Sequence, residues 1–287
     1  MSRVPWNVLR PLACAAWLLC MLPAPAGAQA QHGEVDATAL AKKTQNPVGD
    51  LVSLPFQFNF NSGGGYVDQT YFNLNFQPVI PIKISPKTNI IARMIVPFVN
   101  LPGPTPFDRT GGIADIQAQL YFTPSNPGAL IWGVGPVFSL PTATNDLART
   151  GAWAMGPGGV ALTMTGPWVL GGLLNVMWTF SDEGGDPETN MLTMQPFVNY
   201  NFGKGWAISS SPLLTMNMDA PSGQEWTIPL GLGITRTTQF NGRPMTVGVQ
   251  FYGNVEHPDA AAATQLRFIL SLLYPNKPHP KPAAHTP

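Results

Sequence analysis

Apolar side chains alternate with small or amide side chains along most of the chain. One face of the first such run carries Phe56, Phe58 and Phe60, and the other face carries Gln57 and Asn59. A period of two is typical of β-strands, whose successive side chains point to opposite faces. The pattern recurs along the chain and predicts twelve strands, at residues 49–60, 70–84, 90–99, 113–122, 129–140, 153–163, 168–180, 191–202, 206–216, 226–238, 245–253 and 265–275.

The connections between these predicted strands alternate in length. Every odd-numbered connection is longer than every even-numbered one, and the short ones are rich in Gly, Pro and Asn, as in "SPKTN", "TGP" and "GKG". Short turns at one end and longer loops at the other are typical of outer-membrane barrels, whose even strand number brings both termini to the periplasm. The predicted fold class is therefore all-β: a closed antiparallel up-and-down transmembrane β-barrel of about 12 strands, with short periplasmic turns and longer extracellular loops.

Six tryptophans follow the first thirty residues, and they divide equally between the two predicted rims. The indole ring prefers the headgroup level of a bilayer, where its apolar body and its polar N–H are both satisfied, and barrels carry aromatic girdles at both interfaces. We therefore predict a girdle made of Trp132, Trp168 and Trp206 beside short turns and of Trp153, Trp178 and Trp226 beside long loops.

Composition narrows the choice between a membrane barrel and a soluble one. Only 10% of the residues are charged, whereas a typical soluble domain has about 25%. A soluble sandwich or a lipocalin-like barrel would also alternate, but its solvent face would need charged residues, and here the non-apolar face is amide, hydroxyl and glycine. The formal net charge of zero gives no electrostatic footprint for nucleic acid.

The two ends of the chain differ in composition from the barrel region. Residues 1–30 combine a basic start, an apolar stretch and small residues, which predicts a signal peptide. Cys14 and Cys20 both lie in it, so the mature chain would have no disulfide and no cysteine ligand; a lipoprotein signal is disfavoured by the residues that precede each cysteine. Residues 31–48 predict an N-terminal segment with a short helix, which either plugs the lumen or lies in the periplasm. Residues 49–275 are the predicted outer-membrane β-barrel, and residues 276–287 a Pro-rich flexible tail.

Several blocks, in chain order from about residue 40 to 275, resemble one family of outer-membrane β-barrels. They read "LAKKTQNPVGDLVSLPFQFNFN", "GIADIQAQLYFTP", "WGVGPVFSLPTAT", "MQPFVNYNFGKGWAISSSP", "EWTIPLGLGITR" and "QLRFILSLLYP". The family is named after the meta-pathway of phenol degradation, and its members are labelled transporters or, misleadingly, neuromedin. The resemblance implies a 12-stranded barrel and a transport role without an established substrate. One departure is that barrels commonly end on an aromatic residue that the assembly machinery reads, whereas here a tail follows Tyr274 and Pro275.

Candidate enzymatic chemistry is sparse. His257 is the only histidine of the barrel region, and with Glu256 and Asp259 it could form an outer-membrane lipase-like or protease-like site, although a solvated loop histidine is favoured. The acidic residues Asp182, Glu183, Asp186 and Glu188 do not have the spacing of a calcium loop, and a solvated outer loop is favoured there too. We therefore predict a protein that is not an enzyme and has no cofactor and no bound metal.

Strand parity predicts which side chains line the lumen: Lys83, Arg93, Asp115, Gln117, Gln119, Tyr121, Asn175, Gln195, Asn199, Gln250, Tyr252 and Arg267. Three basic residues against one acidic residue favour anionic or neutral solutes, unless aspartate and arginine pair internally and only brace the wall. Arg236 has lipid-facing parity but lies near a turn, from which it can snorkel to the interface.

The sequence thus predicts a channel of the bacterial cell outer membrane for passive uptake of small neutral, aromatic or weakly anionic solutes. Its predicted partners are the outer-membrane lipid bilayer, the barrel-assembly machinery and a small-molecule solute. Two alternatives remain open: an outer-membrane barrel enzyme, and a structural or adhesive barrel whose loops bind partners.

Overall fold

Fifteen β-strands form one antiparallel sheet in the computed structural model. The structure describes residues 37–63, 69–103, 108–145, 148–182 and 190–275, so the predicted signal peptide and the Pro-rich tail lie outside the described residues. The strands are β1 (Leu51–Ser62), β2 (Tyr71–Phe76), β3 (Val79–Lys83), β4 (Thr88–Pro102), β5 (Arg109–Ile113), β6 (Ile116–Pro124), β7 (Leu130–Leu140), β8 (Ala152–Thr165), β9 (Trp168–Asp182), β10 (Met191–Gly203), β11 (Trp206–Ser210), β12 (Leu214–Asn217), β13 (Trp226–Phe240), β14 (Arg243–Glu256) and β15 (Thr264–Pro275).

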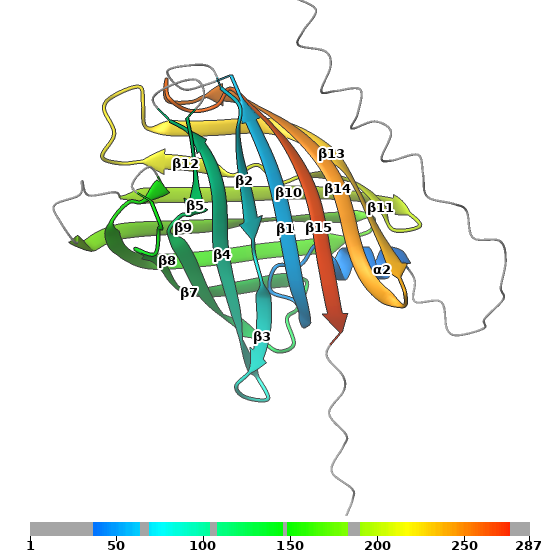
Figure 1. The fold of residues 1–287 in the computed structure, drawn as a ribbon. Coiled ribbons are helices and arrows are strands. Elements are labelled where there is room, and N and C mark those ends of the chain that lie inside the picture. The colour runs from blue at the N-terminus through cyan, green and yellow to red at the C-terminus, as the bar shows by residue number, and fades with distance from the viewer. Residues whose placement is uncertain (1–36, 64–68, 104–107, 146–147, 183–189, 276–287) are drawn as a thin grey trace, which may run out of the picture. The chain divides into compact units, whose positions relative to one another are not determined.

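The sheet closes on itself. The first and last strands, β1 and β15, pair along their whole length, from Leu51 opposite Pro275 to Ser62 opposite Thr264, and they lie side by side in Figure 1. Successive strands pair around the ring, and β9 pairs with β10, so the described sheet has no free long edge. Closure satisfies the backbone groups of every strand, which a bilayer requires because its core offers no water.

Three of the twelve predicted strands are each interrupted once. The predicted run 70–84 is split into β2 and β3, 113–122 into β5 and β6, and 206–216 into β11 and β12. In each case both halves pair with a shared neighbour and so occupy one strand position in the barrel. The twelve predicted runs therefore correspond to twelve strand positions around the barrel. Pro78 and Pro212 lie at two of the breaks, where the missing N–H removes a ladder hydrogen bond.

The alternation of short and long connections is confirmed. One rim carries the turns 84–87, 125–129, 166–167, 204–205 and 241–242, and each is shorter than each connection at the other rim. The turn at residues 241–242 is shorter than the connection predicted from the sequence, between residues 238 and 245. Asn241 and Gly242 both have positive φ, 48° and 72°, respectively. Such an Asn-Gly pair forms a two-residue type I′ hairpin, which lets β13 and β14 extend to Phe240 and Arg243.

The barrel carries its apolar side chains outside and its polar ones inside. Leu230, Leu232 and Phe251 remain 59%, 61% and 55% exposed, whereas Asn59 and Arg267 are only 1% and 5% exposed. A soluble sandwich or lipocalin-like barrel would bury the first set and expose the second. The soluble alternative is therefore wrong, and the faces match those of an outer-membrane-type barrel. Among the described residues, no helix is both long and apolar enough to cross a bilayer.

The tryptophans expected to form the girdle lie at or near strand ends. Trp132, Trp153, Trp168 and Trp178 are between 39% and 48% exposed, and Trp206 and Trp226 are partly exposed. Near the short-turn rim, the ring of Trp168 lies 4.7 Å from that of Tyr200. The guanidinium of Arg236 lies 5.0 Å from the Trp206 ring, across the pair that joins β11 and β13. This outward arginine therefore has an aromatic partner close to the rim.

A short helix, α2 (Ala37–Thr44), packs against the short-turn end of the barrel (Figure 1). Lys42 Nζ donates to the Gly166 carbonyl at 2.6 Å, across the β8–β9 turn. After the helix, the amides of Gln45 and Asn201 donate to each other's side-chain oxygens at 3.0 and 3.1 Å. These contacts hold the end of α2 and the residue after it against the short-turn end of the barrel.

Candidate functional site

Two cavities are stacked in the barrel interior. The upper cavity, toward the long-loop rim, has a volume of about 380 Å³, and the lower cavity, toward α2, has a volume of about 210 Å³. Five residues line both cavities and are called the shared ring: Gln57, Gln77, Arg93, Leu173 and Gln195. They come from β1, the β2–β3 junction, β4, β9 and β10, so the ring is built by opposite walls of the barrel.

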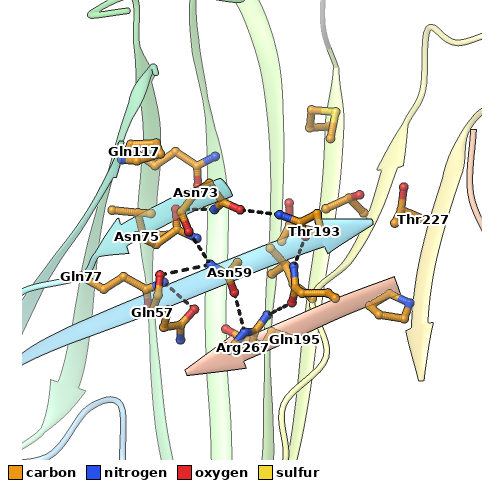
Figure 2. Close-up of a pocket in the computed structure, with 18 of the residues that line it drawn as sticks. Gln57, Asn59, Asn73, Asn75, Gln77, Gln117, Thr193, Gln195, Thr227 and Arg267 are labelled. Carbon is orange, nitrogen blue, oxygen red and sulfur yellow. Dashed lines mark hydrogen bonds between the residues drawn. The ribbon is translucent and has the colours of Figure 1, made fainter. Parts of the chain in front are cut away.

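A ladder of amide side chains forms one wall of the upper cavity. Each strand contributes every second residue: Gln57, Asn59 and Asn61 from β1, and Asn73, Asn75 and, just past its end, Gln77 from β2. The amides bond to one another, as in Asn61 to Asn73 at 2.9 Å and Asn73 to Asn75 at 3.1 Å. In Figure 2, four of these amides, Gln57, Asn73, Asn75 and Gln77, lie on one side of the view, and Thr193 and Thr227 lie on the other. These mutual bonds fix the amides in place, and a fixed set of donors and acceptors is a polar surface for a solute.

Arg93 is held in the shared ring by neutral partners. Its Nη1 donates to Gln119 Oε1 at 3.1 Å and its Nη2 to Gln77 Oε1 at 2.7 Å. The network continues across the barrel, because the Tyr121 hydroxyl contacts Gln119 Oε1 at 3.2 Å and donates to Asn175 Oδ1 at 2.9 Å. The partners that position this guanidinium are thus neutral amides.

Arg267 lies higher in the same lumen and is held in the same way. Its Nε donates to Asn59 Oδ1 at 2.9 Å, its Nη2 to Gln265 Oε1 at 2.8 Å and its Nη1 to the Ser211 carbonyl at 3.2 Å. The guanidinium also lies 5.0 Å from the Tyr252 ring. Both arginines therefore add positive charge to the lumen while their hydrogen-bond partners are neutral.

The wall across from the amide ladder is partly apolar, which the sequence analysis did not foresee. Leu173 and Met177 of β9 and Met191 of β10 line the upper cavity. Lower in the barrel, buried apolar residues from several strands form a continuous cluster: Val48, Val79, Ile91, Tyr121, Val160, Leu162, Val169, Leu173 and Phe197. The interior is therefore amphipathic rather than uniformly amide-lined.

The segment after α2 forms the floor of the lower cavity. Residues 44–47 line it together with Ser209 and Gln250. Gln250 Nε2 donates to Ser209 Oγ at 2.9 Å, but Gln250 Oε1 is buried without a hydrogen-bond partner among the described residues. This oxygen is an acceptor available to a solute or to water.

Asp115 does not pair with an arginine of the lumen. Its carboxylate accepts bonds from the backbone N–H of Ala143 at 2.9 Å, and from the N–H and hydroxyl of Thr150 at 2.7 and 2.6 Å. It therefore fastens the long loop after β7 to the break between β5 and β6. The alternative in which Asp115 forms an ion pair with a lumen arginine is therefore wrong.

Most of the other residues predicted to line the lumen do line a cavity, and three of them do not. Arg93, Gln117, Gln119, Asn175, Gln195 and Arg267 line the upper cavity, and Arg93, Gln195, Asn199 and Gln250 line the lower one. Tyr121 and Tyr252 are fully buried and support neighbouring side chains rather than lining a cavity. Lys83 is exposed at the short-turn end of β3 and lines neither cavity, because its strand extends beyond the lumen.

The residues considered for catalysis or metal binding do not converge on a site. His257 Nδ1 lies 2.9 Å from the carbonyl of the adjacent Pro258, which is neither a nucleophile nor an acid–base partner. The described residues contain no group of three or more His, Cys, Asp or Glu side chains arranged to hold a metal ion. Of the acidic loop, Glu183, Asp186 and Glu188 lie outside the described residues, as does the side chain of Asp182.

The chain matches no protein-family model and no curated protein. Its fold is similar to that of an outer-membrane channel from Pseudomonas putida F1, with a TM-score of 0.60 and 11% identity over 86% of this chain and 100% of that one. The monoaromatic hydrocarbon channel CymD matches with a TM-score of 0.43 and 10% identity over 90% of this chain and 96% of that one. Outer-membrane phospholipase A from Escherichia coli matches with a TM-score of 0.44 and 9% identity over 84% and 98%, respectively.

Proposed function

We propose that this protein is an outer-membrane channel through which small neutral, aromatic or weakly anionic solutes diffuse passively into a bacterial cell. The observation that carries the proposal is the pair of adjacent cavities that share a ring of lining residues, inside a barrel whose outer face is apolar. An apolar exterior suits hydrocarbon, and a partly polar interior with stacked cavities suits stepwise passage of a small molecule.

The fold supports the same proposal. The barrel from Pseudomonas putida F1, which shares this fold, is itself described as an outer-membrane channel. The sequence blocks that resemble the phenol-degradation family of barrels favour a transport role as well. In this proposal the short turns face the periplasm, the barrel-assembly machinery inserts the chain, and the protein acts as a channel rather than as an enzyme.

Conductance across a planar lipid bilayer tests the proposal. Purified wild-type protein should produce discrete ion-conducting events, because water and ions can occupy the two cavities. Gln195→Trp should lower the conductance by at least about half, because the added indole would project into both cavities at the shared ring.

The matched control is the neighbouring residue of β10, which points the other way. Met194 lies on the outer face and lines neither internal cavity, so Met194→Trp should conduct like the wild type. Both variants should first be shown to fold, by the shift in gel mobility between heated and unheated samples. Silent bilayers with folded wild-type protein, or equal conductance of the two variants, would contradict the proposal.

A further inference from the structure

We propose that the upper cavity is a recognition site for a small apolar carboxylate, that is, a compact hydrocarbon ring or chain that carries one carboxylate group. This inference deepens the proposed function, on which it rests, by naming the chemical class of solute that the lumen selects. It is carried by two lumen arginines on one side of the cavity and by an apolar wall on the other.

The arginines have donors left for a ligand. A guanidinium has five N–H donors. The hydrogen bonds of Arg93 to Gln119 and Gln77 use two of them, and those of Arg267 use three. Both side chains line the upper cavity, which is the part of the lumen that a solute can enter. Guanidinium groups match the planar geometry of a carboxylate and bind it with charge-assisted hydrogen bonds.

No carboxylate of the described residues competes for these arginines in the two cavities. Among the described residues, the two cavities are lined by no aspartate and no glutamate. Asp115, the acidic residue that strand parity placed in the lumen, is instead occupied by the loop after β7. A buried cation whose partners are all neutral favours an anion that arrives from solution.

The apolar wall explains why a carboxylate with a hydrocarbon body is favoured over a small inorganic anion. Leu173, Met177 and Met191 line the cavity from β9 and β10, across the barrel from the amide ladder and from Arg267. Methionine side chains adapt to irregular shapes and contact aromatic rings favourably. A volume of about 380 Å³ lies at the lower end of the range for small-molecule sites, so the solute must be compact.

The site suits passage as well as recognition. A channel conducts only if a solute binds well enough to enter and weakly enough to leave. Arg93 lines both cavities, whereas Arg267 lines only the upper one, so a carboxylate can move from the higher arginine to the lower one and then into the lower cavity. Two arginines at different depths thus form successive binding positions along one route.

Uptake into proteoliposomes tests the inference with four probes: benzoate, benzyl alcohol, benzylamine and acetate. For the wild type, benzoate should enter faster than benzylamine, which has a similar ring and the opposite charge, and faster than acetate, which lacks the ring. In the double variant Arg93→Gln, Arg267→Gln, benzoate uptake should fall by about tenfold or more, because hydrogen bonds to a charged group contribute at least a factor of that size. Benzyl alcohol uptake should stay unchanged.

Arg236→Gln is the control, because it makes the same arginine-to-glutamine change, once, on the outer face of the barrel, where Arg236 contacts Trp206. It should leave the benzoate to benzyl alcohol ratio at the wild-type value. Met191→Asn should lower the ratio of benzoate to acetate uptake, since it makes the apolar wall polar.

The outcomes separate this inference from the proposed function. If the wild type admits benzyl alcohol but does not favour benzoate over benzylamine, the carboxylate site is wrong and the channel stands. The same conclusion follows if the folded double variant keeps the wild-type benzoate to benzyl alcohol ratio. If no probe enters and bilayers are silent, the proposed function itself fails.

Discussion

An arginine introduced in the middle of the outer face should destabilise the barrel strongly. Leu232 is 61% exposed and lies one residue from the centre of the 15-residue strand β13. At about 3.4 Å per residue, it is about 3 Å along the strand from the centre. We therefore expect Leu232→Arg to lower the free energy of unfolding by the full midplane cost, about 2–4 kcal/mol.

The loss of stability caused by an outward arginine should be smaller near the rim of the barrel than at the bilayer midplane. Val255 is also outward, at 65% exposed, but it is the second-last residue of the 14-residue strand β14. It lies about 19 Å along the strand from the centre, which is about 14 Å of height at a typical strand tilt, beyond half of an apolar band about 25 Å tall. Val255→Arg should therefore cost only about 0–1 kcal/mol.

An arginine that points into the lumen is the second control. Thr193 lines the upper cavity, so Thr193→Arg should cost less than about 1 kcal/mol because its charge stays in a polar, hydrated space. The assay is urea unfolding in phospholipid vesicles, followed by tryptophan fluorescence. Equal losses for the outer midplane, outer rim and lumen variants would refute the assignment of faces.

Three further variants test packing, the N-terminal segment and a loop. Gly158→Ala should lower stability by about 1–3 kcal/mol, because its Cβ would lie 2.5 Å from Asn175 Oδ1, whereas Gly128→Ala, with open space around it, should change little in the same unfolding assay. Removing residues 37–47 should raise single-channel conductance, since residues 44–47 line the floor of the lower cavity; unchanged conductance would contradict this. Asp115→Ala should speed trypsin cleavage of the long loop after β7 by about tenfold or more, because three hydrogen bonds are lost, and unchanged cleavage would show that other contacts hold the loop.

The barrel could be predicted from the sequence because its two faces contact different environments. Alternation such as Phe58, Asn59, Phe60 fixes which side chain points outward, and the contrast in connection length fixes which ends share a rim. Parity also placed Arg93 and Arg267 in the lumen, where the structure has them lining the upper cavity. Each of these inferences needs only neighbours along one strand.

What the sequence did not reveal depends on neighbours across the barrel. Leu173 and Phe197 point inward although they are apolar, because they pack in a cluster contributed by several strands and by Val48 of the N-terminal segment. The reassignment of Asp115 from the lumen to a loop likewise depends on residues more than twenty positions away. Such contacts leave no periodic signal in the strand that carries them.

The amide ladder, by contrast, does have a signal in the sequence. The amide ladder consists of two triplets at a spacing of two, in strands that are adjacent along the chain and therefore adjacent in the sheet. Antiparallel pairing brings Asn59 directly opposite Asn73, and Gln57 opposite Asn75. A search for matched amide triplets in consecutive strands would have identified this wall of the lumen from the sequence.

A spin-label scan along β1 tests the central claim, that apolar side chains face lipid and amides face a wet lumen. Both cysteines, Cys14 and Cys20, precede residue 30, so in a chain expressed from residue 31 onward, single-cysteine variants at positions 56–61 can each carry one nitroxide. In vesicles, labels at 56, 58 and 60 should be most accessible to oxygen dissolved in the bilayer, and labels at 57, 59 and 61 to a water-soluble nickel complex. The reverse pattern, or equal accessibility at all six positions, would contradict the account.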